Sequence, residues 1–147
     1  MKCSMKFASL LVFSVFSSPV LAGSDCEHDQ MNLQINLIEE IKGDLFVALH
    51  NSGDTYLAKD SEPFRYTVAE VATKGSQQVS ICDVEAGAYA VSIFQDENRN
   101  GELDSNFIGI PKEPYGFSNN LKKMRPPSFE EALFEYDAGE VVVINLK

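Results

Sequence analysis

The chain has 147 residues, with 22 acidic and 12 basic side chains and a formal net charge of −10 at pH 7. A chain this acidic lacks the clustered Lys and Arg that bind phosphate, so we expect no nucleic acid, anionic lipid surface or acidic polymer as a partner. Cationic ligands and divalent metal ions are compatible with this charge.

The first 22 residues have the layout of a secretory signal peptide. A positive head with two lysines precedes an apolar run at 7–16, and a proline breaks the chain before the small residues around Ala22. We therefore predict cleavage after Ala22, a mature domain of residues 23–147, and a periplasmic or secreted location. Cleavage removes two lysines and no acid, which leaves 10 basic and 22 acidic residues and a charge of −12.

Neither a membrane span nor a lipid anchor is expected in the mature chain. The apolar run is about half as long as the roughly 20 residues that cross a bilayer, and no later segment is longer. A lipid anchor needs a cysteine at the first mature position, where this sequence has Gly23. We therefore expect no membrane insertion.

Two cysteines, Cys26 and Cys82, remain after Cys3 is lost with the signal peptide. In an oxidising compartment an even pair is most simply a disulfide, so we predict a Cys26–Cys82 bond. The alternative, a redox pair or a metal thiolate site, lacks the CxxC spacing that would support it.

Alternation of apolar and polar residues predicts about seven short strands. Residues 31–37 alternate without a break, and a turn at 42–44 predicts a hairpin with a returning strand at 45–50. The other expected strands are 64–69, 79–81, 89–93, 132–136 and 141–146. Strands at this spacing favour one all-β domain, an antiparallel β-sandwich. Only Ser128 to Glu131 has a capping-box pattern, and we expect a short helical turn there or none.

The segment 96–127 shows no periodicity, and loops of this length in a compact domain are uncommon and often functional. Four of the six prolines lie in it, together with Phe107, Tyr115 and Phe117. This composition predicts an ordered loop packed on the sandwich. It serves either as a lid over a sheet edge or core end, or as a binding platform, and both interpretations stay open.

The start of this loop has oxygen-bearing side chains at the spacing of an EF-hand, with Gly101 at the position of the sharp turn. The expected calcium ligands are Asp96, Asn98, Asn100, Glu102 through its backbone carbonyl, and Asp104. Phe107 stands where an EF-hand has a bidentate Glu, so binding should be weak, about 0.1 to 1 mM, unless Glu113 completes the shell. The alternative is a metal-free turn in which these side chains accept backbone hydrogen bonds.

Several long motifs in and around this loop resemble those of the bacterial exported family catalogued as domain of unknown function 2141. They lie at residues 43–49, 87–91, 95–104, 106–113, 115–120 and 126–130. The resemblance covers nearly the whole mature chain and implies an exported β-sandwich with no established catalytic activity. The pattern Gly87-x-Tyr89-x-Val91 is also similar to transthyretin-like and carboxypeptidase-regulatory domains, so a transthyretin-like or immunoglobulin-like sandwich is expected.

Three functions stay under consideration. The chain is a binding or accessory module, a purely structural envelope subunit whose open sheet edge pairs with a partner, or an enzyme. For the first function, the expected ligand-binding residues are Tyr115, Phe117, Asn119 and Asn120, facing a glycan, a peptide or another envelope component.

An enzyme is the least expected of the three. The sequence has no GxSxG elbow, no HExxH and no glycine-rich phosphate loop. The two histidines, His28 and His50, are interpreted as solvated or packing residues. We assign no catalytic residue, and the sequence sets neither the ligand nor the oligomeric state.

Overall fold

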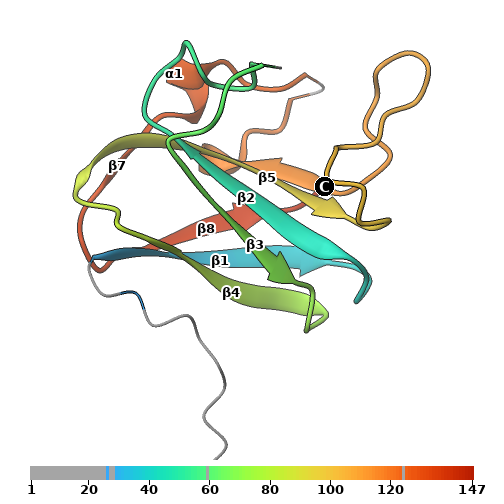
Figure 1. Cartoon of the computed structure of the whole chain (residues 1–147), viewed down its shortest axis with the longest axis horizontal. Helices are drawn as coiled ribbons and strands as arrows, with labels where there is room; N and C mark the ends of the chain where they lie inside the picture. Colours follow the sequence, from blue (N-terminus) through green and yellow to red (C-terminus); the bar gives the residue numbers. More distant parts are fainter. Residues whose placement is uncertain (1–25, 27–28, 59, 124) are drawn as a thin grey trace, which may run out of the picture.

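The computed structural model describes residues 26, 29–58, 60–123 and 125–147, which form two β-sheets packed face to face (Figure 1). The predicted signal peptide and its cleavage after Ala22 lie outside the described residues. Within the described part, no helix is both long enough and apolar enough to span a membrane.

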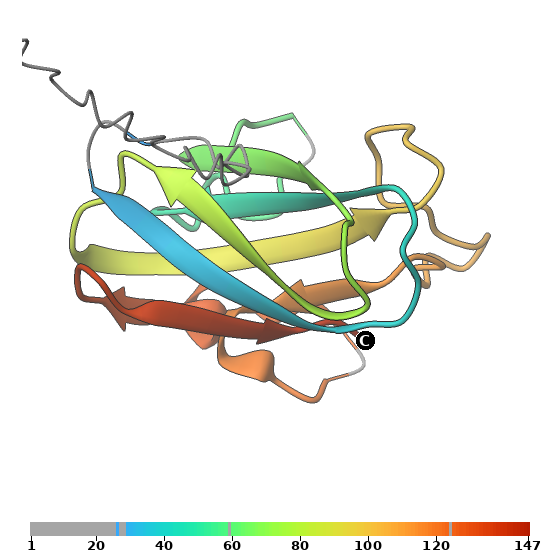
Figure 2. The same ribbon diagram turned by 90° about the horizontal axis from the view of Figure 1, so that it is seen from below.

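The first sheet has three strands in the order β4-β1-β8. Figure 2 shows β1 (Gln30–Ile38) between β4 (Gly75–Cys82) and β8 (Val141–Asn145). The β1 strand runs antiparallel to β4 and parallel to β8. The predicted sandwich is therefore confirmed, although one of its ladders is parallel.

The second sheet has the order β3-β2-β5-β6. Its strands are β2 (Asp44–His50), β3 (Arg65–Glu70), β5 (Gly87–Asp96) and β6 (Tyr115–Phe117). The short β7 (Phe134–Tyr136) pairs with the first residues of β5. Two short helical elements, the 3₁₀ turn η1 (Ser118–Asn120) and the single helical turn α1 (Phe129–Ala132), lie beside this sheet.

The core fills the space between the sheets and follows the period of two that the sequence predicts. The buried apolar side chains of this core in the central strands include Met31, Leu33 and Ile35 in β1, Leu45, Val47 and Leu49 in β2, and Val91 and Ile93 in β5. Because both sheets turn one apolar face inward, these residues form one continuous core.

The predicted hairpin between 31–37 and 45–50 is wrong. The two strands belong to different sheets, since β1 pairs with β4 and β8 while β2 pairs with β3 and β5. Both strands present an apolar side to the same core from opposite layers, and a period of two does not distinguish this arrangement from a hairpin.

The crossing between β1 and β2 requires Gly43. Its φ is +66°, and a Cβ at this position would lie 1.8 Å from the carbonyl oxygen of Asp96. Only glycine permits this contact, which holds the start of β2 against the end of β5 where the long loop begins.

The structure changes two further expectations about the C-terminal half. The segment 96–127 contains β6 and η1, so it is not irregular throughout. Ala132, expected at the start of a strand, ends α1 instead, and the capping box of Ser128 and Glu131 that the sequence suggests is present.

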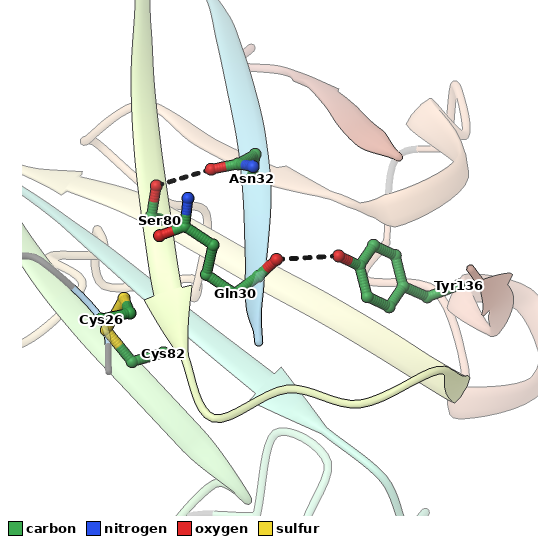
Figure 3. Close-up of a disulfide and its surroundings, with 6 residues drawn as sticks. All are labelled: Cys26, Gln30, Asn32, Ser80, Cys82 and Tyr136. Atoms are coloured by element: carbon green, nitrogen blue, oxygen red, sulfur yellow. Dashed lines mark hydrogen bonds between the residues drawn. A yellow bond between two sulfur atoms is a disulfide. The ribbon is translucent and has the colours of Figure 1, made fainter. Parts of the chain in front are cut away.

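The predicted disulfide is present at one end of the sandwich. Cys26 and Cys82 are bonded, with their Cα atoms 5.3 Å apart (Figure 3). Nearby, the hydroxyl of Tyr136 donates to the carbonyl oxygen of Gln30 at 2.9 Å. These contacts tie the beginning of β1 to β4 and β7.

Candidate functional site

The outer face of the β3-β2-β5-β6 sheet carries two rows of mainly apolar side chains. Because Leu45, Val47 and Leu49 point into the core, Phe46 and Ala48 point outward. The strand register sets one row as Val68, Phe46, Phe94 and Tyr115, and the next as Tyr66, Ala48, Ser92 and Phe117. Five aromatic rings therefore lie on a face that is not part of the core.

These rings form a surface with a hollow in it. Phe46 and Phe94 stack at 5.1 Å between ring centroids, and Tyr115 meets Phe117 edge to face at 5.9 Å. The hollow has a volume of about 260 Å³, and its lining includes Phe46, Ala48, Pro63, Tyr66, Ser92 and Phe94. Tyr66 is 68% exposed and Val68 is 45% exposed. An exposed apolar patch of this kind marks an interaction site more often than an isolated surface side chain does.

A partly buried polar pair lies beside the hollow, on the same side of the sheet. Nε2 of His50 and Oγ of Ser92 share a hydrogen bond of 3.0 Å, and the His50 ring meets Tyr56 edge to face. Burial lowers the pKa of His50. Burial, and then the charge of Glu131, raises the pKa of Tyr56 to about 12. Both side chains are therefore neutral at pH 7.

A hydrogen-bonded serine and histidine are two parts of a nucleophilic site, but the other parts are not found here. Within the described residues, Nδ1 of His50 has no hydrogen-bond partner that would orient the ring. Ser92 lies mid-strand, paired with Ala48 on one side and Phe117 on the other, so the backbone N–H groups around it serve the sheet and not an oxyanion. The pair is better suited to holding the wall of the hollow.

The predicted calcium residues form one hydrogen-bonded network in the long loop. Buried Asp96 accepts from the backbone N–H groups of Asn100 (3.1 Å) and Gly101 (2.7 Å). The amide nitrogens of Asn98 and Asn100 donate to the two carboxylate oxygens of Asp104, at 2.7 and 3.1 Å. Four of the five predicted ligands are thus brought together.

The oxygens of this network already have donors. Those of Asn98 and Asn100 accept the N–H groups of Asn100 and Glu102, at 2.9 and 2.8 Å. No group of three or more His, Cys, Asp or Glu side chains suited to a metal ion occurs among the described residues. These contacts match the metal-free turn, and calcium would require both Asn amides to turn their oxygens toward the ion.

Glu113, suggested as an additional calcium ligand, is buried under the loop. Its two carboxylate oxygens accept the backbone N–H groups of Glu97 and Asp104, each at 2.9 Å. This one side chain therefore joins the two ends of the predicted metal loop.

The four predicted ligand-binding residues have two different roles. Tyr115 and Phe117 lie at the β6 side of the aromatic face, and Phe117 also packs against the small cluster formed by Tyr56, Ala90 and Ala132. The amide of Asn119 donates to the carbonyls of Glu131 and Leu133, and that of Asn120 bonds the backbone of β8. Both amides are therefore occupied by backbone groups.

The sequence did not lead us to the aromatic face, although it contains a signal for it. Residues 45–49 and 88–91 lack polar side chains, whereas a strand with one solvated face alternates. Such runs indicate strands covered on both faces. Among the described residues, Tyr56 and Phe129 cover one end of the outer face, next to Ala90 and Phe117.

A second exposed apolar feature is the tip of the long loop, which projects beyond β5 (Figure 1). Phe107 is 99% exposed, and Ile108 and Ile110 are also exposed. The side-chain oxygen of Asn106 accepts the N–H groups of both isoleucines at 3.0 Å, which gives the tip a defined shape.

Comparison with known protein families gives a match that covers most of the chain. The family model described as "Uncharacterized protein conserved in bacteria (DUF2141)" matches residues 33–144, which include the aromatic face and the long loop. Comparison with curated proteins and with solved structures gives no match. The match extends over most of the chain, as the resemblance of its motifs implies, and the chain therefore belongs to this bacterial family of uncharacterized proteins.

Proposed function

We propose that the chain is an exported, non-catalytic binding module whose outer aromatic face holds an apolar side chain from a cationic segment of an envelope protein. The observation that carries the proposal is the hollow lined by Phe46, Tyr66 and Phe94 on a face outside the core. Burying one large apolar side chain contributes roughly 1.5–3 kcal/mol, so the hollow acts as one anchor within a larger contact.

The chemistry of the hollow favours an apolar group over a sugar. Phe46 and Phe94 stack on each other, so each has one ring face that is not available to a sugar. Ser92 is already bonded to His50, which leaves few polar groups for sugar hydroxyls. The amides of Asn119 and Asn120, expected to assist, bond to backbone atoms instead.

Charge supports a cationic partner. The three acids at one end of the aromatic face already have partners, since Asp96 is buried under the loop and Arg99 pairs with Asp44 and Glu70, so the support comes from the net charge of the chain. After loss of the signal peptide the whole chain would carry −12. Long-range attraction would therefore steer a basic segment toward this surface.

Export is supported by the sequence of the first 22 residues and by the Cys26–Cys82 disulfide, which persists in oxidising compartments. The N-terminus of the protein recovered from the bacterial envelope tests it by mass spectrometry. We expect it to begin at Gly23, and a chain recovered from the cytoplasm with Met1 would contradict export.

Binding is tested by following the amide signals of isotope-labelled protein during titration with a short Lys-rich peptide that contains one Phe. We expect saturable shifts at Phe46, Ala48 and Ser92, and none with a peptide in which Ser replaces that Phe. Phe94→Ser should abolish the shifts. The matched control is Val143→Ser, which changes an exposed residue of the other sheet and should leave them intact.

Two outcomes would remove this proposal. One is the absence of saturable shifts at these residues at millimolar peptide. The other is binding of neutral oligosaccharides at the same residues without binding of the peptide, which would make the ligand a glycan.

Calcium is a separate part of the proposal. It is supported by the hydrogen bonds of Asn98 and Asn100 to Asp104, and it requires both amides to turn their oxygens toward the ion. We expect a dissociation constant of about 0.1–1 mM. Calorimetric titration of chelator-treated protein tests it, and no heat and no rise in Tm at several millimolar calcium would leave only the hydrogen-bonded turn.

A further inference from the structure

The outer edge of β3 carries backbone groups that do not pair with β2 and that point away from the sheet. The N–H of Val71 donates to the carbonyl of Gly43 at 3.1 Å, and in the register of β2 and β3 this makes 69/45 and 67/47 the hydrogen-bonded pairs. The N–H and C=O groups of Tyr66, Val68 and Glu70 therefore point away from β2. Consistent with this direction, the Glu70 carbonyl accepts a hydrogen bond from the Gln77 side chain.

Two other edges, those of β8 and β6, are protected, but the edge of β3 lacks the same devices. The side chain of Asn120 bonds the carbonyl of Val143 at 2.8 Å and the N–H of Asn145 at 2.7 Å, which blocks the edge of β8. The β6 strand has only three residues, and its Tyr115 exchanges two backbone bonds with Lys147. In contrast, β3 has no proline, no lysine and no bulge against β2, and these are the usual devices that prevent strand addition.

The side chains beside this edge are apolar, and the edge itself is electrically neutral. Tyr66 and Val68 are both exposed on the outer face. The strand has one charge of each sign, Arg65 at its start and Glu70 at its end, and Glu70 is also ion-paired with Arg99. The chain as a whole is acidic, but β3 has no net charge, so the β3 strands of two copies do not repel each other. Antiparallel pairing brings the Arg65 end of each strand to the Glu70 end of the other.

We propose that two copies of this chain associate through β3, with the strands antiparallel about a two-fold axis at Thr67. Tyr66 of each copy then exchanges backbone hydrogen bonds with Val68 of the other, and the two side chains form an aromatic and β-branched cross-strand pair. The two five-stranded sheets become one continuous sheet with both aromatic faces on the same side. This inference goes beyond ligand binding at the hollow and does not depend on it.

A proline at Val68 tests the pairing without disturbing the monomer. Its N–H points away from β2, so Val68→Pro removes a bond to the second copy and none within the chain. Light scattering after size exclusion should give twice the monomer mass for the unmodified protein at up to about 1 mM, where weak contacts are populated. Val68→Pro should give the monomer mass. The matched control, Val68→Thr, keeps the N–H and the β-branch and should remain a dimer.

A cysteine at the axis tests the register even if the proline variant fails to fold. Thr67 would face Thr67 of the second copy as a non-hydrogen-bonded pair, whose Cα atoms lie about 4.5 Å apart, close enough for a disulfide. Thr67→Cys should therefore form a reducible dimer under mild oxidation, whereas the control Ala69→Cys, which would face Arg65, should not. A monomer at every concentration, or equal cross-linking of both variants, would overturn the proposal, and a monomer that gains only an extended foreign peptide at β3 would do the same.

Discussion

Burial of His50 makes the stability of the fold depend on pH. Its pKa in the folded chain lies below the unfolded value of 6.5, so between these two values the unfolded chain binds more protons. Stability due to the neutral ring is present above pH 6.5 and decreases as the pH falls from 6.5 toward the folded pKa. The hydrogen bond from Lys123, and to a smaller extent those from the Ser128 backbone and Arg125, lower the pKa of Glu131 to about 2. The stability due to this carboxylate is therefore lost only as the pH falls below its ordinary value of 4.5. The two windows are therefore separate.

We predict that His50→Gln removes most of the stability change between about pH 7.5 and about pH 5. The Gln amide can still reach Ser92, and it takes up no proton in this range. Urea unfolding at both pH values measures the difference. Equal losses in the variant and the unmodified protein would show that another group is responsible.

Asn120 combines two structural roles in one residue. Its φ of +49° lies in the left-handed region that Asn tolerates, and its amide makes both bonds to the edge of β8. Replacing it removes a side chain that acts as a short piece of neighbouring strand. Asn120, predicted as a ligand-binding residue, therefore has a structural role as well.

We predict that Asn120→Gly lowers the free energy of unfolding by about 2 kcal/mol, since two backbone groups of β8 lose their partner. Asn120→Ala should lose roughly 1–2 kcal/mol more, because alanine also strains the left-handed backbone. Denaturant unfolding of the two variants separates the roles. If alanine and glycine cost the same, backbone strain contributes nothing.

At the scale of elements, the long loop is shaped largely by Glu113. One oxygen of its buried carboxylate holds the start of the predicted metal loop, and the other holds its end. The order predicted from the four prolines of 96–127 therefore has an additional cause that composition does not reveal.

We predict that Glu113→Gln destabilises the fold by about 2 kcal/mol, because an amide NH₂ replaces one acceptor and meets a backbone N–H. The loss should be local, with faster hydrogen exchange at Glu97 and Asp104 and unchanged protection in β1 and β2. Glu102→Gln, on the exposed part of the same loop, is the matched control. Uniform loss of protection in both variants would contradict a local role.

The alternation of apolar and polar residues predicted the strands of the core, but it did not predict which strands pair with each other. The pattern around Leu33 or Val91 depends only on which side of a strand is buried, so it can be recognised locally. Whether β1 and β2 share a sheet depends on how residues 39–43 cross the sandwich. The three residues of β6 are too few to show a period of two. The Ser92–His50 bond joins residues 42 apart, which only the register of β2 and β5 brings together.

At the scale of the whole molecule, the sandwich presents two outer faces of different chemistry. The face of β4-β1-β8 has the exposed Val141 and Val143 on β8 and otherwise mainly amide and hydroxyl side chains that bond one another. Asn36 bonds Asn145 at 3.2 Å. Ser80 bonds Asn32 at 2.8 Å (Figure 3). These polar groups satisfy each other and remain solvated. The opposite face has aromatic rings, and its free energy decreases when it is covered. This asymmetry favours the second sheet for both ligand binding and self-association.

The disulfide contributes to the stability of the whole sandwich by joining Cys26, which precedes β1 in the chain, to the end of β4. Cys26 and Cys82 are 56 residues apart, and a loop of this length lowers the entropy of the unfolded chain by the equivalent of about 4 kcal/mol. The double variant Cys26→Ser/Cys82→Ser should therefore unfold at a lower urea concentration and lose about that much free energy of unfolding. The amide spectrum of its core residues should stay native, because a serine hydroxyl fits the space of each sulfur. Reducing agent should lower the unmodified protein to the same midpoint and leave the double variant unchanged. A loss below about 1 kcal/mol would mean that the unfolded chain is already compact around this pair, and the compartment would then matter little for folding.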